Sequence, residues 1–114
     1  MNLLFICSRN QWRSPTGEAL YWKTSGVSVR SAGTSPNARR TVSAKDVTWA
    51  DLIFVMEDKH KNRLRGMFPA PTKFAEIHVL DIPDEYQKND PELIELLRSG
   101  TAGIIERAQG RAQK

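Results

Sequence analysis

The amino-acid sequence has few residues that form covalent crosslinks or bind metals. Its 114 residues include one cysteine, Cys7, and two histidines, His60 and His78. A single cysteine cannot form an intramolecular disulfide, which excludes a disulfide framework and a relay between two thiols of the same chain. The histidines fall on different predicted elements with no cysteine nearby, so the sequence predicts no metal site and no cofactor.

Long hydrophobic runs are also missing. No apolar stretch approaches the roughly 20 residues that a membrane-spanning helix requires. The apolar run at the N-terminus is too short for the core of a signal peptide and has no basic residues before it. We therefore expect a cytoplasmic protein without a membrane segment. The length fits one domain, residues 1–114, with one hydrophobic core.

Positive charge is in excess. The formal net charge is +4 and the pI is about 9.5, which favours anionic partners such as phosphate esters, nucleic acids or acidic protein surfaces. The basic run Lys59–Arg65 is typical of a solvated helix face and has no accompanying pattern of aromatic residues. This composition argues against nucleic acid as the partner.

Apolar runs alternate with helical patterns along the chain. Strands are predicted where short apolar runs are bounded by polar residues, at Asn2–Cys7, Val27–Gly33, Asp51–Met56 and Phe74–Leu80. Helices are predicted from Ser14 to near Gly26, within Ser35–Ala50 and over His60–Phe68. Residues Pro91–Leu97 and Thr101–Ala112 are predicted to form one kinked helix or two short ones, with Gly100 as the break. This alternation predicts an α/β fold, a three-layer open sheet of four parallel strands with helices on both faces.

Local signals add detail to these helices. Ser43 and Asp46 have the spacing of a capping box at the start of the second helix. Leu64 and Met67 are expected on the buried face of the basic helix. The basic tail Gly110–Lys114 is expected to fray.

The most reactive side chains follow the ends of the predicted strands. They are Cys7, Ser31–Thr34, Glu57 with Asp58, and Asp81–Tyr86. In an open parallel sheet the ligand lies at the carboxyl ends of the strands. The topology therefore gathers these candidates in one place.

The loop from Cys7 to Arg13 joins a strand to the N-terminus of a helix. Such a loop directs backbone N–H groups and the positive end of the helix dipole to its centre, which makes an anion site. Arg13 can bind two oxygens of that anion through its planar guanidinium group. The same environment favours the thiolate of Cys7 as a nucleophile. Ser14 can donate a hydrogen bond to the sulfur, and Asn10 tolerates the left-handed conformation that a ring of inward N–H groups often needs.

Phosphoryl transfer to sulfur also requires a proton donor for the leaving oxygen. Asp84, which follows Pro83 in the stretch DIPDEYQ, is the first candidate, and Asp81 is its competitor. Tyr86 is expected either to stack against an aromatic leaving group or to pack on the rim of the site.

These residues resemble a known family, the low-molecular-weight protein tyrosine phosphatases, whose signature is a cysteine, five residues, arginine and serine near the N-terminus. CSRNQWRS (7–14) matches it, and the resemblance continues through SAGT (31–34), ADLIFVME (50–57) and IPDEYQKND (82–90), over nearly the whole chain. It implies a phosphotyrosine protein phosphatase I-like fold and a metal-independent cysteine phosphatase.

The resemblance also implies roles for individual residues. Cys7 would be the nucleophile, Arg13 the phosphate clamp, Ser14 the thiolate stabiliser, Asp84 the general acid and base, and Asn10 with Ser31 the loop support. The substrate contacts are expected from Ser8, Arg9, Asn10, Gln11, Trp12 and Tyr86.

The sequence departs from the family pattern in several places. Arg9 stands where a glycine is usual, and Trp12 stands where many members have a second cysteine. The segment after SAGT is about twenty residues shorter than is usual, which removes much of one wall of the substrate cleft. A histidine that commonly supports the phosphate loop is expected to be replaced by Asn37, and the acid loop has the order Asp84-Glu85-Tyr86 in place of aspartate-proline-aromatic.

The function predicted from these observations is phosphomonoester hydrolysis through a cysteinyl-phosphate intermediate. Phosphotyrosine in a protein or a small aryl phosphate is the expected substrate, and a small-molecule phosphate or a nucleotide is the alternative. Two other functions stay open. One is an anion-binding module without turnover, and the other is an arsenate reductase-like enzyme that uses an external thiol, because the chain has no second cysteine of its own.

Overall fold

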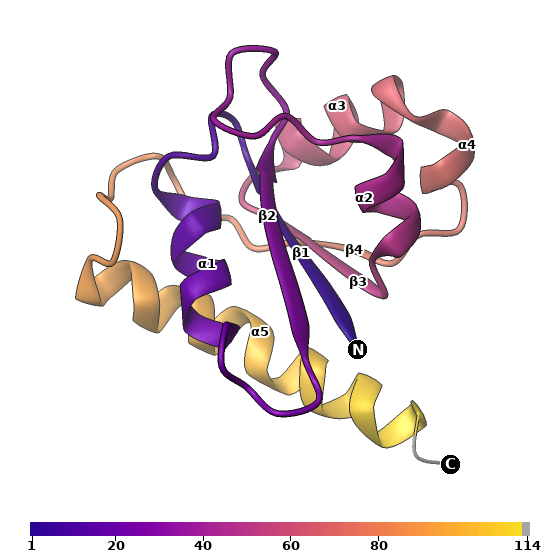
Figure 1. Cartoon of the computed structure of the whole chain (residues 1–114). Coiled ribbons are helices and arrows are strands. Elements are labelled where there is room, and N and C mark those ends of the chain that lie inside the picture. Colours follow the sequence, from indigo (N-terminus) through magenta and orange to yellow (C-terminus); the bar gives the residue numbers. More distant parts are fainter. Residues whose placement is uncertain (113–114) are drawn as a thin grey trace.

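The computed structural model describes residues 1–112 (Figure 1). Four strands alternate with helices along the chain. The strands are β1 (Asn2–Cys7), β2 (Ser28–Gly33), β3 (Leu52–Val55) and β4 (Ile77–Val79). The helices are α1 (Arg13–Tyr21), α2 (Ala44–Trp49), α3 (Asp58–Met67), α4 (Pro69–Thr72) and α5 (Pro91–Ala112).

The strands form one parallel sheet in the order β2-β1-β3-β4. The central strand β1 pairs with both neighbours, so that Leu4 lies opposite Arg30 on one side and Ile53 on the other. Residues Leu3 to Cys7 are all buried, as expected for a strand covered on both faces. The α/β fold predicted from the sequence is confirmed.

The two faces of the sheet bury separate sets of apolar side chains. Leu3, Phe5 and Cys7 point to the face covered by α1 and α5, and Leu4 and Ile6 point to the face covered by α2 and α3. Figure 1 shows α1 and α5 together on one side of the sheet and α2, α3 and α4 on the other. Because successive side chains of a strand point to opposite faces of the sheet, one short run of residues contributes to both hydrophobic cores.

Two glycines allow close packing at the end of β1 and β2. A Cβ atom on Gly17 would lie 2.5 Å from the Phe5 ring, so the absence of a side chain lets α1 lie directly on β1. A Cβ atom on Gly33 would lie 2.5 Å from the carbonyl oxygen of Ser8, so this glycine lets the loop after β1 lie against the end of β2. Both positions bring the β1–α1 loop close to the sheet.

Some local predictions are confirmed and others are wrong. The capping box of Ser43 and Asp46 is present at the start of α2. Met67 is 38% exposed and does not share the buried face of Leu64. Gly100 does not break a helix, because α5 is continuous, and its missing side chain instead leaves room for Leu80, whose Cδ2 would lie 3.3 Å from a Cβ there.

The remaining differences lie near the ends of elements. No pattern in the sequence predicted α4, which begins at Pro69 directly after α3. Residues 110–112 of the basic tail continue α5, and residues 113–114 lie outside the described residues. Among the helices of residues 1–112, none is long and apolar enough to cross a membrane.

Candidate active site

A small pocket of about 70 Å³ lies at the carboxyl end of β1. It is enclosed by the loop after β1 and by the loop after β4. Its lining residues are Cys7, Ser8, Arg9, Gln11, Trp12, Arg13 and Asp84. The structure thus brings together the predicted nucleophile, the predicted phosphate clamp and the predicted acid, from positions up to 77 residues apart in the chain.

The backbone of the phosphate loop, residues 7–13, is oriented by the segment that follows β2. The carbonyl oxygens of Cys7, Ser8 and Arg9 accept hydrogen bonds from the N–H groups of residues 34, 35 and 39 at 3.0, 2.9 and 3.1 Å. In the described part of the chain, the backbone N–H groups of residues 8–14 have no hydrogen-bond acceptor. Donors without a protein partner at a helix N-terminus provide the binding groups for an oxyanion.

The side chain of Asn10 supports the middle of the phosphate loop through hydrogen bonds. Its φ is 56°, the left-handed conformation that the sequence predicted for this residue. Its side-chain amide donates to Ser14 Oγ at 2.9 Å and to Ser31 Oγ at 3.0 Å, and the Ser31 hydroxyl donates in turn to Glu18 at 2.5 Å. Asn10, Ser14 and Ser31 are all buried, so the hydrogen bonds of this network are shielded from water.

The thiol of Cys7 contacts one polar side chain. Cys7 is 3% exposed, and its Sγ lies 2.9 Å from Ser14 Oγ. Ser14 Oγ already accepts the amide of Asn10, and its own hydrogen can go to Cys7 or to the carbonyl of Ala32 at 3.3 Å. A thiolate is the stronger acceptor, so the Ser14 hydroxyl is placed to donate to it.

Arg13 is buried and bound on one edge only. Its Nη1 donates to Glu57 Oε1 at 2.5 Å and to the carbonyl oxygen of Ile82 at 2.9 Å, which uses both hydrogens of that nitrogen. Nε lies 3.7 Å from Asp84 Oδ1, and Nη2 has no partner among residues 1–112. The Nε–Nη2 edge therefore remains available for two oxygens of an anion.

Glu57 is the partner that fixes Arg13. Partial burial acts to raise the pKa of Glu57, but the hydrogen bond and the positive charge of Arg13 outweigh it and hold this pKa below its usual value. Glu57 is therefore ionised at neutral pH and balances the buried guanidinium charge. Sequence analysis noted Glu57 only as a residue at a strand end and assigned it no role.

The loop after β4 supplies one carboxylate to the pocket. Asp84 lines it and its side chain is 60% exposed. Asp81 is exposed with a φ of 55°, and it does not line the pocket. Tyr86 packs against the core of the α1 and α5 face and donates to Glu92 at 3.3 Å, so it is also outside the lining of the pocket. The placement favours Asp84 over Asp81 as the acid, and it does not support Tyr86 as a substrate contact.

His60 is a loop support that sequence analysis missed. Its Nδ1 accepts the backbone N–H of Glu57 at 3.0 Å, which places the ring proton on Nε2, 2.8 Å from Ser8 Oγ. Burial, followed by the charge of Arg13, lowers the pKa of His60 to about 4, so the ring is neutral at neutral pH. Asn37, expected as the substitute for a supporting histidine, is exposed and contacts Ser35 through its backbone N–H.

Within residues 1–112, no group of three or more His, Cys, Asp or Glu side chains is placed to hold a metal ion. The buried side-chain nitrogen and oxygen atoms in this range all have hydrogen-bond partners.

Known proteins resemble this chain in sequence and in fold. No protein-family model matches the chain. A probable low molecular weight protein-tyrosine-phosphatase EpsP of Ralstonia nicotianae is 27% identical over 136 aligned positions, which cover 92% of this chain and 94% of that protein. This alignment is longer than the chain itself, so the chain lacks residues that the relative has.

Solved structures share the fold. A low molecular weight phosphotyrosine phosphatase of Vibrio cholerae O395 superposes with a TM-score of 0.76 at 20% identity, over 97% of this chain and 98% of the other. Wzb of Vibrio vulnificus, in complex with benzylphosphonate, superposes with a TM-score of 0.74 at 21% identity, over 93% and 97%. The chain is therefore similar in sequence to the Ralstonia protein, though shorter than it, and similar in fold to the low molecular weight phosphotyrosine phosphatase of Vibrio cholerae and to Wzb.

Proposed function

We propose that this protein hydrolyses phosphomonoesters through a cysteinyl-phosphate intermediate. The observation that carries the proposal is the pocket lined by Cys7, Arg13 and Asp84, with the Nε–Nη2 edge of Arg13 and the backbone N–H groups of the phosphate loop left without a strong acceptor. Each group answers a separate need of phosphoryl transfer: a nucleophile, a clamp for the equatorial oxygens, and a proton donor. The related Ralstonia protein and the Vibrio cholerae structure carry phosphatase names, which supports the same reaction class.

In the first step the Cys7 thiolate attacks phosphorus in line with the leaving oxygen. The S–P bond forms as the ester P–O bond breaks, and Asp84 donates its proton to the departing alkoxide or phenoxide. The loop N–H groups and Arg13 bind the equatorial oxygens. The Ser14 hydroxyl, 2.9 Å from the sulfur, stabilises the thiolate before attack.

In the second step water releases the phosphate. Asp84, now a carboxylate, takes a proton from the water as its oxygen attacks phosphorus, and the S–P bond breaks to return the thiolate and inorganic phosphate. The ion pair of Arg13 with Asp84 at 3.7 Å is weak, because the Asp84 side chain is 60% exposed.

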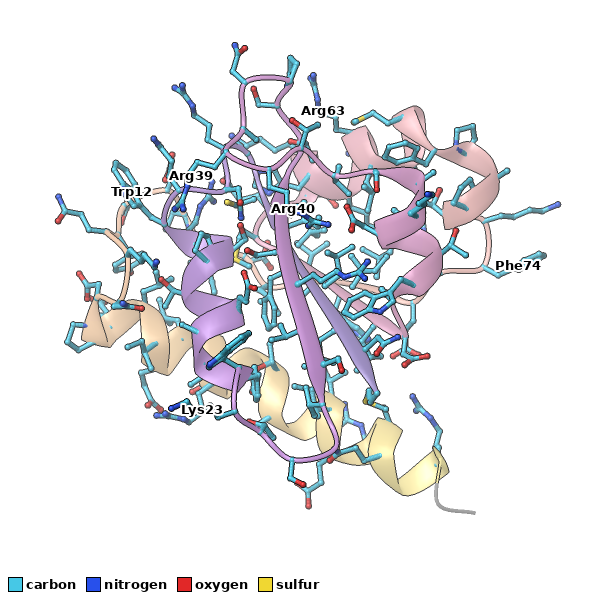
Figure 2. All side chains as sticks on the ribbon, viewed as in Figure 1. Trp12, Lys23, Arg39, Arg40, Arg63 and Phe74 are labelled. Atoms are coloured by element: carbon cyan, nitrogen blue, oxygen red, sulfur yellow. The ribbon has the colours of Figure 1, made fainter. Side chains whose placement is uncertain are left out.

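An aryl phosphate is the substrate that best fits the mouth of the pocket. Trp12, 42% exposed on the rim, offers an aromatic surface to a phenyl ring (Figure 2). Wzb of Vibrio vulnificus was solved in complex with benzylphosphonate, which carries a phenyl ring one carbon away from phosphorus, and this supports an aromatic group in the ligand. Phosphotyrosine in a protein is therefore our proposed substrate class, and a cytoplasmic location is kept as the prediction from the sequence.

Hydrolysis of p-nitrophenyl phosphate in the presence of a metal chelator tests the proposal. The wild type is compared with Cys7→Ser and Asp84→Asn, with a thermal unfolding curve for each variant to show that it is folded. We expect loss of turnover in Cys7→Ser and a strong reduction in Asp84→Asn. A folded wild type that binds phosphate but does not turn over this ester would instead support an anion-binding module.

A further inference from the structure

A second groove opens on the other side of Ser8. It has a volume of about 580 Å³, against about 70 Å³ for the pocket around Cys7. We call it the α3 groove, and its lining residues are Ser8, Thr34, Ser35, Lys59, His60, Asn62 and Arg63. Ser8 lines both spaces and directly follows the nucleophile in the chain, so a molecule whose phosphate lies on the loop has the α3 groove beside it.

The α3 groove carries positive charge without a carboxylate in its lining. Arg63 is exposed and makes no ion pair among the described residues. Lys59 is 65% exposed, and its Nζ lies 3.8 Å from Glu57 Oε1, but that oxygen already accepts the shorter bond from Arg13. Arg63 is therefore free to bind an external anion, and the exposed Lys59 can do so by leaving its 3.8 Å contact with Glu57.

Neutral hydrogen-bond donors lie beside these cations. The Ser35 hydroxyl accepts the N–H of Asn37 at 3.1 Å and keeps its own hydrogen to donate. Asn62 makes only a long contact of 3.4 Å to Asp58, so its amide can turn to a ligand. Figure 2 shows Arg63 at the same end of the molecule as Trp12 and Arg39, the end where the phosphate loop lies. The α3 groove thus combines charge and donors suited to carboxylate oxygens.

We propose that the α3 groove binds an acidic side chain of a phosphopeptide, next to the residue whose phosphate occupies the loop. The inference rests on the proposed function, because it takes the phosphate loop as the site of the phosphoryl group. A peptide fits better than a small doubly charged ester for two reasons. The volume of the α3 groove exceeds that of one carboxylate group. Lys59 and Arg63 are four residues apart on one face of α3, so they can bind an acidic side chain at more than one position of a peptide.

A binding measurement tests the inference without requiring turnover. The probe is a short peptide with a phosphonate analogue of phosphotyrosine, whose P–C bond the protein cannot hydrolyse. One peptide carries glutamate on both sides of the phosphonate residue and the other carries glutamine, which has the same shape without the charge. Affinities are measured with the wild type and with Lys59→Gln/Arg63→Gln, whose positions are exposed.

We expect the wild type to bind the glutamate peptide about fivefold to tenfold more tightly than the glutamine peptide at low salt, and the double variant to lose this preference to within about twofold. The matched control, Lys23→Gln/Lys73→Gln, removes the same charge at exposed positions that line neither space, and it should keep the preference. Lys23 lies at the opposite end of the molecule from the loop (Figure 2).

Two results would overturn the inference. One is an equal affinity of the wild type for both peptides, and the other is an equal loss of preference in the two double variants, which would indicate a general charge effect. Neither result depends on hydrolysis of p-nitrophenyl phosphate, so failure of this inference and failure of the proposed function are seen in separate experiments.

Discussion

The two loops that form the pocket are held in very different ways. The phosphate loop is fixed by buried hydrogen bonds from Asn10, Ser14 and Ser31 and by three backbone bonds from the segment after β2. The loop after β4 is mostly exposed, and Asp84 reaches the site only through a 3.7 Å contact with Arg13. The comparison indicates that anion binding depends on buried side chains, whereas proton transfer depends on the exposed carboxylate of Asp84, although Ile82 anchors its loop in the core.

The largest expected effect comes from Arg13, which connects the two loops. Arg13→Ala removes the oxyanion clamp and leaves Glu57 without its partner, so we expect kcat/KM to fall about 10³-fold and the free energy of unfolding to fall by about 2 kcal/mol. Steady-state kinetics and urea unfolding measure the two effects. Arg13→Ala/Glu57→Ala should regain most of the stability and none of the activity. If the double variant is as unstable as Arg13→Ala, the unpaired carboxylate of Glu57 is not the cause of the lost stability.

Asp84→Asn should impair proton transfer without impairing anion binding. The variant keeps the shape of the side chain but cannot donate the proton, so kcat should fall about 10²-fold or more with alkyl and aryl phosphates. Inhibition by inorganic phosphate and the unfolding midpoint should stay close to those of the wild type, because the exposed loop contributes little to either. Asp81→Asn is the matched control and should change kcat less than about twofold. A larger loss in Asp81→Asn than in Asp84→Asn would reverse the assignment of the acid.

Variants of Asn10 test whether the buried hydrogen bonds of the phosphate loop are needed for anion binding. Asn10→Ala removes both hydrogen bonds donated by the side-chain amide. It also places alanine, which disfavours the left-handed conformation, at a φ of 56°. We expect phosphate affinity and kcat/KM to fall together by about tenfold to thirtyfold, with a loss of about 2 kcal/mol in stability. Asn10→Gly allows the same backbone conformation, so the difference between the two variants measures how much of the loss comes from backbone strain at this position. A change in kcat with unaltered phosphate affinity would contradict a binding role.

The pH dependence of stability should report His60. Its pKa is about 4 in the folded protein and about 6.5 when unfolded, so the unfolded state binds more protons between these values. Stability is therefore complete above pH ~6.5 and is lost as pH falls toward ~4, by about 1 to 2 kcal/mol on going from pH ~7 to ~5.5. Urea unfolding of the wild type against His60→Gln measures it. The variant should show a flatter profile in that window, and parallel profiles would exclude His60 as the cause.

Much of the fold was predictable because its signals are local. Each buried strand is a short apolar run, and the phosphate loop is one continuous stretch whose residues face the same centre. Ser43 with Asp46 was predictable for the same reason, since a capping box spans one helical turn.

The remaining features depend on contacts between distant residues. The bonds of Arg13 to Glu57 and of Ser8 to His60 join positions 44 and 52 residues apart, and no spacing rule within one sequence reveals them. The same limit explains Gly100, which was predicted as a break. A Cβ atom at Gly100 would lie 3.3 Å from Leu80 Cδ2, so the close approach of a distant residue, and not a helix break, accounts for glycine at this position of a continuous helix.

The central claim is that Cys7 carries the phosphoryl group during turnover. The most direct test is to mix the protein with p-nitrophenyl phosphate, quench within the first turnovers in acid, and locate the added mass by peptide mass spectrometry, using Asp84→Asn to slow the second step. We predict one phosphoryl group on the peptide that contains Cys7, and none on that peptide in Cys7→Ala. Release of p-nitrophenol with no phosphoryl group on Cys7, or turnover that survives in Cys7→Ser, would contradict the account.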